Sequence, residues 1–152
     1  MSGQLSHTPS QVIRQLLIDL LLGADGGTSW PVYATHEPNA PDNCITVYDT
    51  VGRNQGRFQV GGEIQETHGI QVKVRATDAQ TASAKASEIK TSLSENVHLT
   101  SVTVTDDEGF GTATQDYVLY NISFSSGPIP IPNPDNDRKV FTLNLLANLR
   151  EN

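Results

Sequence analysis

The side chains that could bind a metal ion or act as bases are few and widely separated. No two histidines have the three- or four-residue spacing that places a pair of metal ligands on one helix face. The four are His7, His36, His68 and His98. His68 and His98 flank predicted strands, so we expect both at the surface. The histidines therefore predict no metal centre.

Cys44 is the only cysteine, which excludes an internal disulfide and a zinc site built from several cysteines. It lies in a β-branched, apolar stretch, where a buried and unreactive thiol is the usual case. The alternative is a catalytic thiol paired with a histidine, and no spacing in the sequence supports it. A chain without disulfides suits a reducing compartment.

The glycines and acids do not form a recognisable ligand site either. The glycines of residues 52–62 do not match GxGxxG, and no Gly-Lys-Ser/Thr follows, so a phosphate loop is not predicted. Asp106, Asp107 and Glu108 lack the repeated spacing of a calcium loop and read as a hairpin turn. The sequence thus predicts no catalytic residue, no cofactor and no metal, and hence no enzyme.

The negative charge is concentrated in one segment. The chain of 152 residues has 10 Lys and Arg against 17 Asp and Glu, a net charge of −7. Residues 91–137 contain no Lys or Arg, and they hold seven acids: Glu95, Asp106, Asp107, Glu108, Asp116, Asp135 and Asp137. This balance argues against a protein that grips nucleic-acid phosphates, which needs a basic face. The segment is either a solvated edge or a surface that faces a polyanion or a basic partner.

An amphipathic helix is predicted near the start of the chain. Thr8 can cap it, with Pro9 at the first helical position and Gln11 completing a capping box. Its apolar stripe consists of Val12, Ile13, Leu16, Leu17, Leu20 and Leu21. We expect Gly23 to end the helix in the left-handed conformation. Residues 1–10 are polar and do not resemble a signal peptide, and no apolar run is long enough to cross a membrane.

The remaining elements predict one α+β domain over residues 1–152. The clearest strand is 69–76, where apolar and polar residues alternate. Asp78 should cap a second helix that reaches about Glu95. Further strands are expected at 30–33, 44–48, 97–105, 117–124 and 139–146. The predicted fold is a mixed, mostly antiparallel sheet with two helices packed on one face, plus extended hairpin or loop arms. The second helix would allow a parallel crossover.

Two segments look suited to contact other proteins. The Gly-rich stretch 52–62 is either a hairpin arm or a mobile loop, and its candidate interface residues are Arg53, Gly56, Arg57 and Phe58. The Pro-rich stretch 127–134 favours polyproline II with an unpaired backbone. Its candidate interface residues are Pro128, Ile129, Pro130, Ile131 and Pro132. Such extended arms commonly lie across a neighbouring chain.

An ordered set of short motifs resembles the tail terminator proteins of long-tailed bacteriophages, also called the minor capsid or tail completion group. The central one is Glu37-Pro38-x-x-Pro41-Asp42-Asn43-Cys44-Ile45-Thr46-Val47-Tyr48-Asp49-Thr50. It is preceded by Pro9…Ile13-Arg14-x-Leu16-Leu17 and Trp30-Pro31-Val32. It is followed by Gly69-Ile70-Gln71-Val72-Lys73-Val74-Arg75, an Ala-rich helix and Phe141-Thr142-Leu143-Asn144. The resemblance covers nearly the whole chain in order.

The resemblance implies a virion protein without cofactor or catalytic residues. Such proteins form a ring, usually of six copies, on the head-proximal end of the tail tube. They stop tube polymerisation and present a surface to the head–tail connector or stopper. The implied partners are other copies of the chain, the tail tube protein and that connector, with DNA passing through as cargo. Assembly in the host bacterial cytoplasm is implied, and no membrane.

The resemblance suggests a role for the acidic turn. An acidic lumen would repel DNA phosphates and prevent sticking, so we expect Asp106, Asp107 and Glu108 at the lumen or an end face. Two alternatives compete with the terminator hypothesis. One is another neck protein, such as a head–tail connector or stopper. The other is a small ligand-binding or enzymatic α+β domain, which would need a pocket with convergent polar groups.

Overall fold

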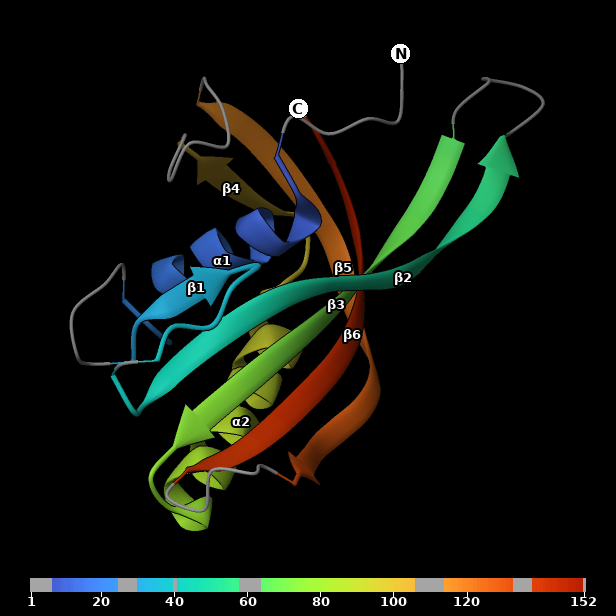
Figure 1. The fold of residues 1–152 in the computed structure, drawn as a ribbon. Coiled ribbons are helices and arrows are strands. Elements are labelled where there is room, and N and C mark those ends of the chain that lie inside the picture. Colours follow the sequence, from blue (N-terminus) through green and yellow to red (C-terminus); the bar gives the residue numbers. More distant parts are fainter. Residues whose placement is uncertain are drawn as a thin grey trace.

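A computed structural model describes residues 7–24, 30–39, 41–57, 64–105, 114–132 and 138–151. In these residues the chain forms two helices and a six-stranded, curled sheet (Figure 1). The elements are α1 (Pro9–Asp19), β1 (Val32–Ala34), β2 (Cys44–Arg57), β3 (Ile64–Ala76), α2 (Ala79–Asn96), β4 (Thr100–Val104), β5 (Gln115–Ile131) and β6 (Lys139–Glu151). The predicted α+β class is confirmed.

The strands lie in the order β1-β2-β3-β6-β5-β4. All neighbouring pairs are antiparallel except β1 and β2. The parallel crossover that the second helix would allow is not formed, because α2 connects β3 to β4 at the far edge, and β4 runs opposite to β3. The parallel pair instead joins β1 and β2 through residues 35–43, with no helix between them.

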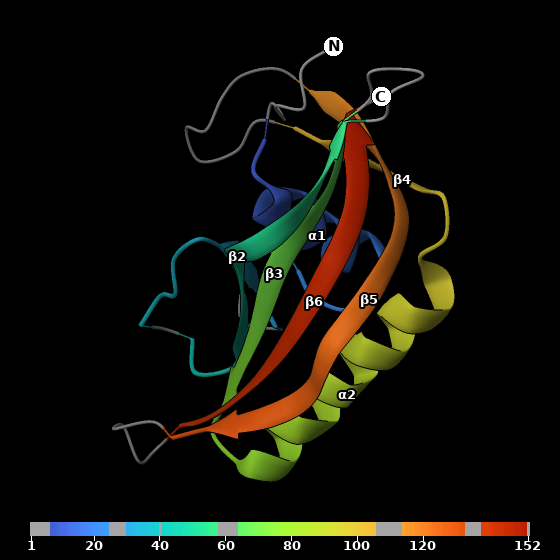
Figure 2. The ribbon, with the colours of Figure 1, turned by 90° about the vertical axis from the view of Figure 1, so that its right-hand side faces the viewer.

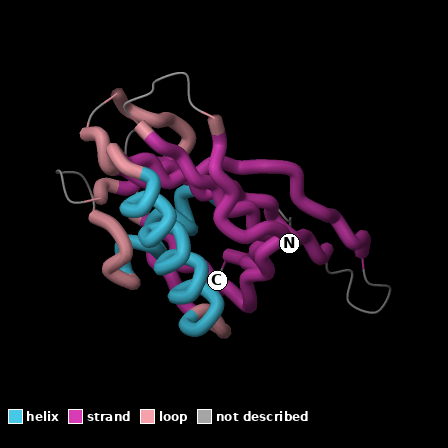
Figure 3. The backbone as a smooth tube through the Cα atoms, turned by 90° about the horizontal axis from the view of Figure 1, so that it is seen from below, coloured by secondary structure: helices cyan, strands magenta, loops and turns pink. Residues whose placement is uncertain are grey.

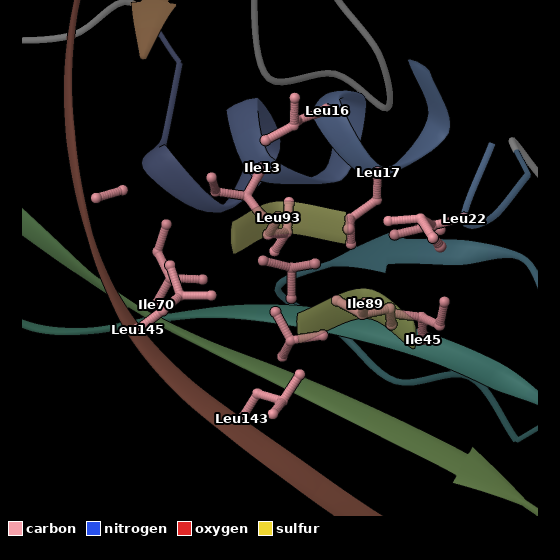
Figure 4. Packing of buried hydrophobic residues seen from close by; sticks show 14 of the residues in the cluster. Ile13, Leu16, Leu17, Leu22, Ile45, Ile70, Ile89, Leu93, Leu143 and Leu145 are labelled. Atoms are coloured by element: carbon pink, nitrogen blue, oxygen red, sulfur yellow. The ribbon is translucent and has the colours of Figure 1, made fainter. Parts of the chain in front are cut away.

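Both helices cover the same face of the sheet, as predicted. Figure 2 looks onto the opposite face, with β2, β3, β6 and β5 in front and the helices behind, and Figure 3 shows the helices together on one side. Alternate residues of the strands point towards the helices and are fully buried, among them Ile70, Val72, Leu143 and Leu145. Figure 4 shows Ile13, Leu16 and Leu17 of α1 and Ile89 and Leu93 of α2 meeting these strands in one core.

Helix α1 begins as the sequence indicates and ends differently. Thr8 and Gln11 form the predicted capping box. The left-handed residue after the helix is Leu21 (φ 61°), not Gly23, and its side chain is 88% exposed rather than part of the buried stripe. Gly23 is needed for a different reason: a Cβ there would lie 2.2 Å from Val32 Cγ2 and 2.9 Å from the Trp30 carbonyl oxygen. The glycine therefore permits close packing against β1.

Helix α2 matches its prediction closely. Asp78 caps it, accepting the Thr81 amide at 2.8 Å. The buried stripe is Ala82, Ala86, Ile89 and Leu93, as expected from the spacing. Leu99, predicted within the next strand, instead precedes β4 with φ 51° and is 59% exposed.

Four strands, β2, β3, β5 and β6, are longer than the sequence predicts. β2 and β3 continue past the core as a hairpin arm, visible at the upper right of Figure 1, so the arm alternative holds up to Arg57 and from Ile64. β5 extends to Ile131 and pairs with β6, for example Ile129 with Thr142 and Pro130 with Phe141. The expectation of an unpaired polyproline arm is therefore wrong for residues 127–131. A proline can occupy an edge strand where its missing N–H would point away from the neighbour.

Candidate interaction surfaces

The segment between β1 and β2 is clamped to the sheet by two arginines. Arg75 of β3 is 2% exposed; its guanidinium donates to Glu37 Oε1 at 3.0 Å and to the Pro41 and Asp42 carbonyls at 2.7 and 3.2 Å. Lys73 adds a 2.9 Å ion pair with Glu37. Arg138, before β6, binds the Asp42 carboxylate at 2.9 Å. This clamp uses the side chains of Glu37 and Asp42, whereas Pro41 contributes only its main-chain carbonyl.

The end of the same motif fixes the start of helix α1. Asp49 on β2 accepts the Ser10 amide at 2.9 Å and the Ser10 hydroxyl at 2.8 Å. A carboxylate at this position satisfies a free amide of the first turn and interacts favourably with the helix dipole. Asp49 therefore serves as a second cap, supplied by the sheet.

A buried polar contact ties the beginning of the described chain to β5. The His7 amide donates to the Tyr117 hydroxyl at 2.8 Å, and His7 Nδ1 lies 2.8 Å from the same oxygen. Burial, partly opposed by that amide, raises the pKa of Tyr117 to about 12. Tyr117 therefore stays neutral at physiological pH. No local pattern in the sequence indicates this pair, because the partners are 110 residues apart.

Cys44 is fully buried at the start of β2, as expected. Burial raises the pKa of its thiol, which disfavours the nucleophilic thiolate. Within the described residues, no group of three or more His, Cys, Asp or Glu could hold a metal ion.

The sheet face without helices carries a row of uncharged polar side chains. Gln71 donates to Asn144 at 3.4 Å, and Asn144 donates to Ser126 at 3.1 Å. Thr67 donates to Asn148 at 3.0 Å, and Asn148 donates to Asn121 at 2.8 Å. Each chain of bonds spans β3, β6 and β5. The signal in the sequence was the polar half of the alternating pattern, which by itself does not say which strands are neighbours.

The residues expected at interfaces fall into three groups. Arg53, Gly56 and Arg57 lie on β2 in the arm, whereas Phe58 lies outside the described residues. Ile129 and Ile131 of β5 are each 41% exposed, beside Pro128, Pro130 and Pro132. The turn of Asp106, Asp107 and Glu108 lies outside the described residues. The arm and the isoleucines lie on different parts of the sheet.

Comparison with known families assigns the chain to one of them. Residues 16–151 match the model of the family described as bacteriophage tail terminator protein. The chain belongs to this tail terminator family. The resemblance of the short motifs is thus confirmed, and the chain is a structural protein of the phage tail, located in the virion.

The fold has a counterpart among solved structures. A chain of the structure entitled "Virion of native gene transfer agent (GTA) particle" matches with a TM-score of 0.53 and 16% identity, covering 93% of this chain and 92% of that one. At this identity the likeness concerns the fold alone. No curated protein sequence matches significantly. In the described part of this terminator-family chain, neither helix could cross a membrane.

Proposed function

We propose that the chain, folded as one domain, forms a closed ring on the head-proximal end of the tail tube. Six copies is the number implied by the resemblance. The ring would stop polymerisation of the tube and join the tail to the head connector, with DNA passing through its lumen. The observation that carries this proposal is the family match over residues 16–151, which spans nearly the whole chain.

The shape of the subunit supports assembly. A ring uses heterologous contacts, in which two different surfaces of the subunit meet. The arm of β2 and β3 and the exposed Ile129 and Ile131 are two such surfaces on different parts of the sheet. We assign them to neighbouring subunits, the tube protein or the connector. The proposal gives the chain no catalytic role.

The decisive experiment measures the assembly itself. The purified protein is analysed by light scattering after size exclusion, alone and with tail tube protein, and each peak is imaged by negative stain. A closed ring that caps tube ends supports the terminator role. A ring that binds only head connector protein would point to a connector or stopper instead. A strict monomer that never associates with tube protein would contradict the proposal.

The acidic turn provides a test of the lumen. We propose that Asp106, Asp107 and Glu108 face the passing DNA, because residues 91–137 carry seven acids and no Lys or Arg. Replacing all three with lysine should slow DNA release, since phosphates would bind the new cations. The rate of ejection is measured by the fluorescence of a DNA dye. Unchanged kinetics in assembled particles would contradict this assignment.

A further inference from the structure

The sheet has two open edges at the same level. On one side β1 pairs with β2 only at residues 45–47, and on the other β4 pairs with β5 only at residues 115–119. Among the described residues, no strand lies beyond β2 from residue 48 onwards or beyond β5 from residue 121 onwards. The register places these openings opposite each other, because Ser123 pairs with Leu146, Leu146 with Gly69, and Gly69 with Thr50.

Both covering strands stop next to a residue in an unfavourable conformation. Thr35, directly after β1, has φ 70°, and Leu99, directly before β4, has φ 51°. Neither is a glycine, so the left-handed conformation costs energy at each position. The Thr35 amide still binds the Val47 carbonyl, and the Leu99 amide the Tyr120 carbonyl. The chain then leaves the edge on each side, and no strand of the described residues lies beside the next residues of β2 and β5.

The open edge of β5 is only partly protected: it has register shifts between Leu119 and Asn121 and between Phe124 and Ser126, and prolines at positions 128 and 130. Natural edge strands carry charges, prolines or bulges that prevent pairing with other chains. β5 has no charged residue from Tyr117 to Ile131, in a chain whose net charge is −7. Pro130 stands opposite Phe141, and since it has no N–H it must occupy a non-hydrogen-bonded pair, with its carbonyl facing outward. Pro130 thus disfavours pairing with another strand near the end of β5, whereas residues 121–126 contain no proline.

Helix α2 approaches this strand from the core face of the sheet. It packs on β3, β5 and β6 and is seen beside β5 in Figure 2. Lys90 Nζ of the helix lies 6.0 Å from the centre of the Phe124 ring. Asn121, Ser123 and Ser125 are exposed, while Ile122 and Phe124 are packed against the core. The side chains therefore alternate between core and solvent. The free backbone N–H and C=O groups of the edge point outward in the plane of the sheet.

We infer that residues 121–125 of one copy pair with residues 48–52 of the next copy, so that the sheets join around the ring. This inference rests on the proposed ring. A second copy fits because each copy supplies both edges, and a heterologous ring needs two different surfaces of one subunit. Within the chain β2 runs opposite to β5. A rotation about an axis along the strands preserves their direction, so the new pair is antiparallel.

Paired cysteines test this contact directly. Thr50 and Ser123 are both exposed and lie on the sheet face away from the helices, at the two ends of one row. After mild oxidation of assembled rings, T50C/S123C should give a ladder of covalent oligomers up to the ring size on a non-reducing gel. The buried Cys44 leaves the parent protein without such a ladder.

Single variants distinguish the geometry. T50C and S123C alone should stay monomeric on the gel, whereas a mixture of the two should give dimers and nothing larger. Dimers from S123C alone would mean an isologous contact and overturn the inference. The control is T50C/S101C, because Ser101 is exposed on the part of β4 that covers β5. It should not form a ladder.

The experiment separates failure of the inference from failure of the ring proposal. N121C and S126C, each combined with T50C, allow for a shift in register. If rings form in the light-scattering measurement and none of the three pairs cross-links above the control, the strand pairing is wrong while the ring stands. If no ring forms even with tube protein, both proposals fail.

Discussion

At the scale of single residues, Arg75 connects the sheet to the segment that precedes β2. Its guanidinium has three acceptors, on Glu37, Pro41 and Asp42, and the side chain is almost fully buried. A buried cation of this kind is tolerated only because its hydrogen bonds are made. Removing it leaves two carbonyl groups and a carboxylate with fewer partners.

We therefore expect Arg75→Ala to lower the free energy of unfolding by about 3 kcal/mol, in the range typical of broken buried ion pairs. Urea denaturation followed by circular dichroism measures the loss. Lys73→Ala is the matched control, because Lys73 binds the same Glu37 but is 27% exposed in its side chain. It should cost less than about 1 kcal/mol. Equal losses would contradict the clamp.

The thiol of Cys44 offers a second test at this scale. Because burial raises its pKa and hides the sulfur, we expect reaction with a thiol reagent to be slow in the folded protein. The absorbance of released thionitrobenzoate follows the reaction at pH 8. Addition of urea above the unfolding midpoint should restore the rate of an ordinary exposed cysteine. Fast labelling of the native protein would show that the strand opens.

At the scale of elements, the two ends of helix α1 differ in how well they are capped. Helix α1 has a capping box and the Asp49 carboxylate at its start, and an exposed leucine in a left-handed conformation after its end. Helix α2 starts at a well-placed aspartate. The weak point is therefore the turn at residues 20–24.

Leu21→Gly should stabilise the protein by about 0.5–1 kcal/mol, because glycine adopts positive φ without a steric penalty and the leucine side chain is already in solvent. Gly23→Ala should destabilise it, since the added methyl would collide with Val32. Thermal unfolding of both variants provides the comparison. If Gly23 were the cap instead, Leu21→Gly would lower the unfolding temperature, because it would place a glycine where an ordinary backbone conformation is adopted.

The cap of α2 predicts a dependence on pH. The Thr81 amide that donates to Asp78 lowers the pKa of this carboxyl below its ordinary value. A lowered folded-state pKa means stabilisation that is present above the unfolded pKa and lost as pH falls through the folded one. Asp78→Ala should therefore reduce the urea midpoint at pH 7 and have less effect at pH 3. Glu95→Ala, at the other end of the helix, should show no such loss at pH 7.

At the scale of the whole molecule, the exposed apolar residues of β5 allow assembly to be tested without a change in folding stability. Ile129 and Ile131 are partly exposed and lie at the end of the strand, next to three prolines. The double variant Ile129→Thr/Ile131→Thr keeps β-branched side chains, so we expect the unfolding midpoint to change little. Association with tube protein or ring closure should weaken about tenfold, because desolvated apolar contacts are lost. Light scattering at a series of protein concentrations measures this association. Leu21→Gly is the control, because it also removes an exposed apolar side chain.

The sequence by itself determined the elements whose signals are local. The alternation at Ile70, Val72 and Val74, the cap at Asp78 and the capping box of Thr8 each depend on neighbours within a few residues, and each is confirmed. The order of short motifs also sufficed to indicate the family. Local sterics and hydrogen bonding decide such features before the chain is compact.

Only the tertiary structure decided what depends on distant partners. Arg75 meets residues about 34 positions away, β5 continues through its prolines because β6 lies alongside, and Gly23 is dictated by Val32 rather than by its own helix. The two open edges lie opposite each other across the sheet only because the register of four strands aligns Thr50 of β2 with Ser123 of β5. These contacts cannot be predicted from the spacing of residues along the chain, because they form only when separate elements pack on a common core.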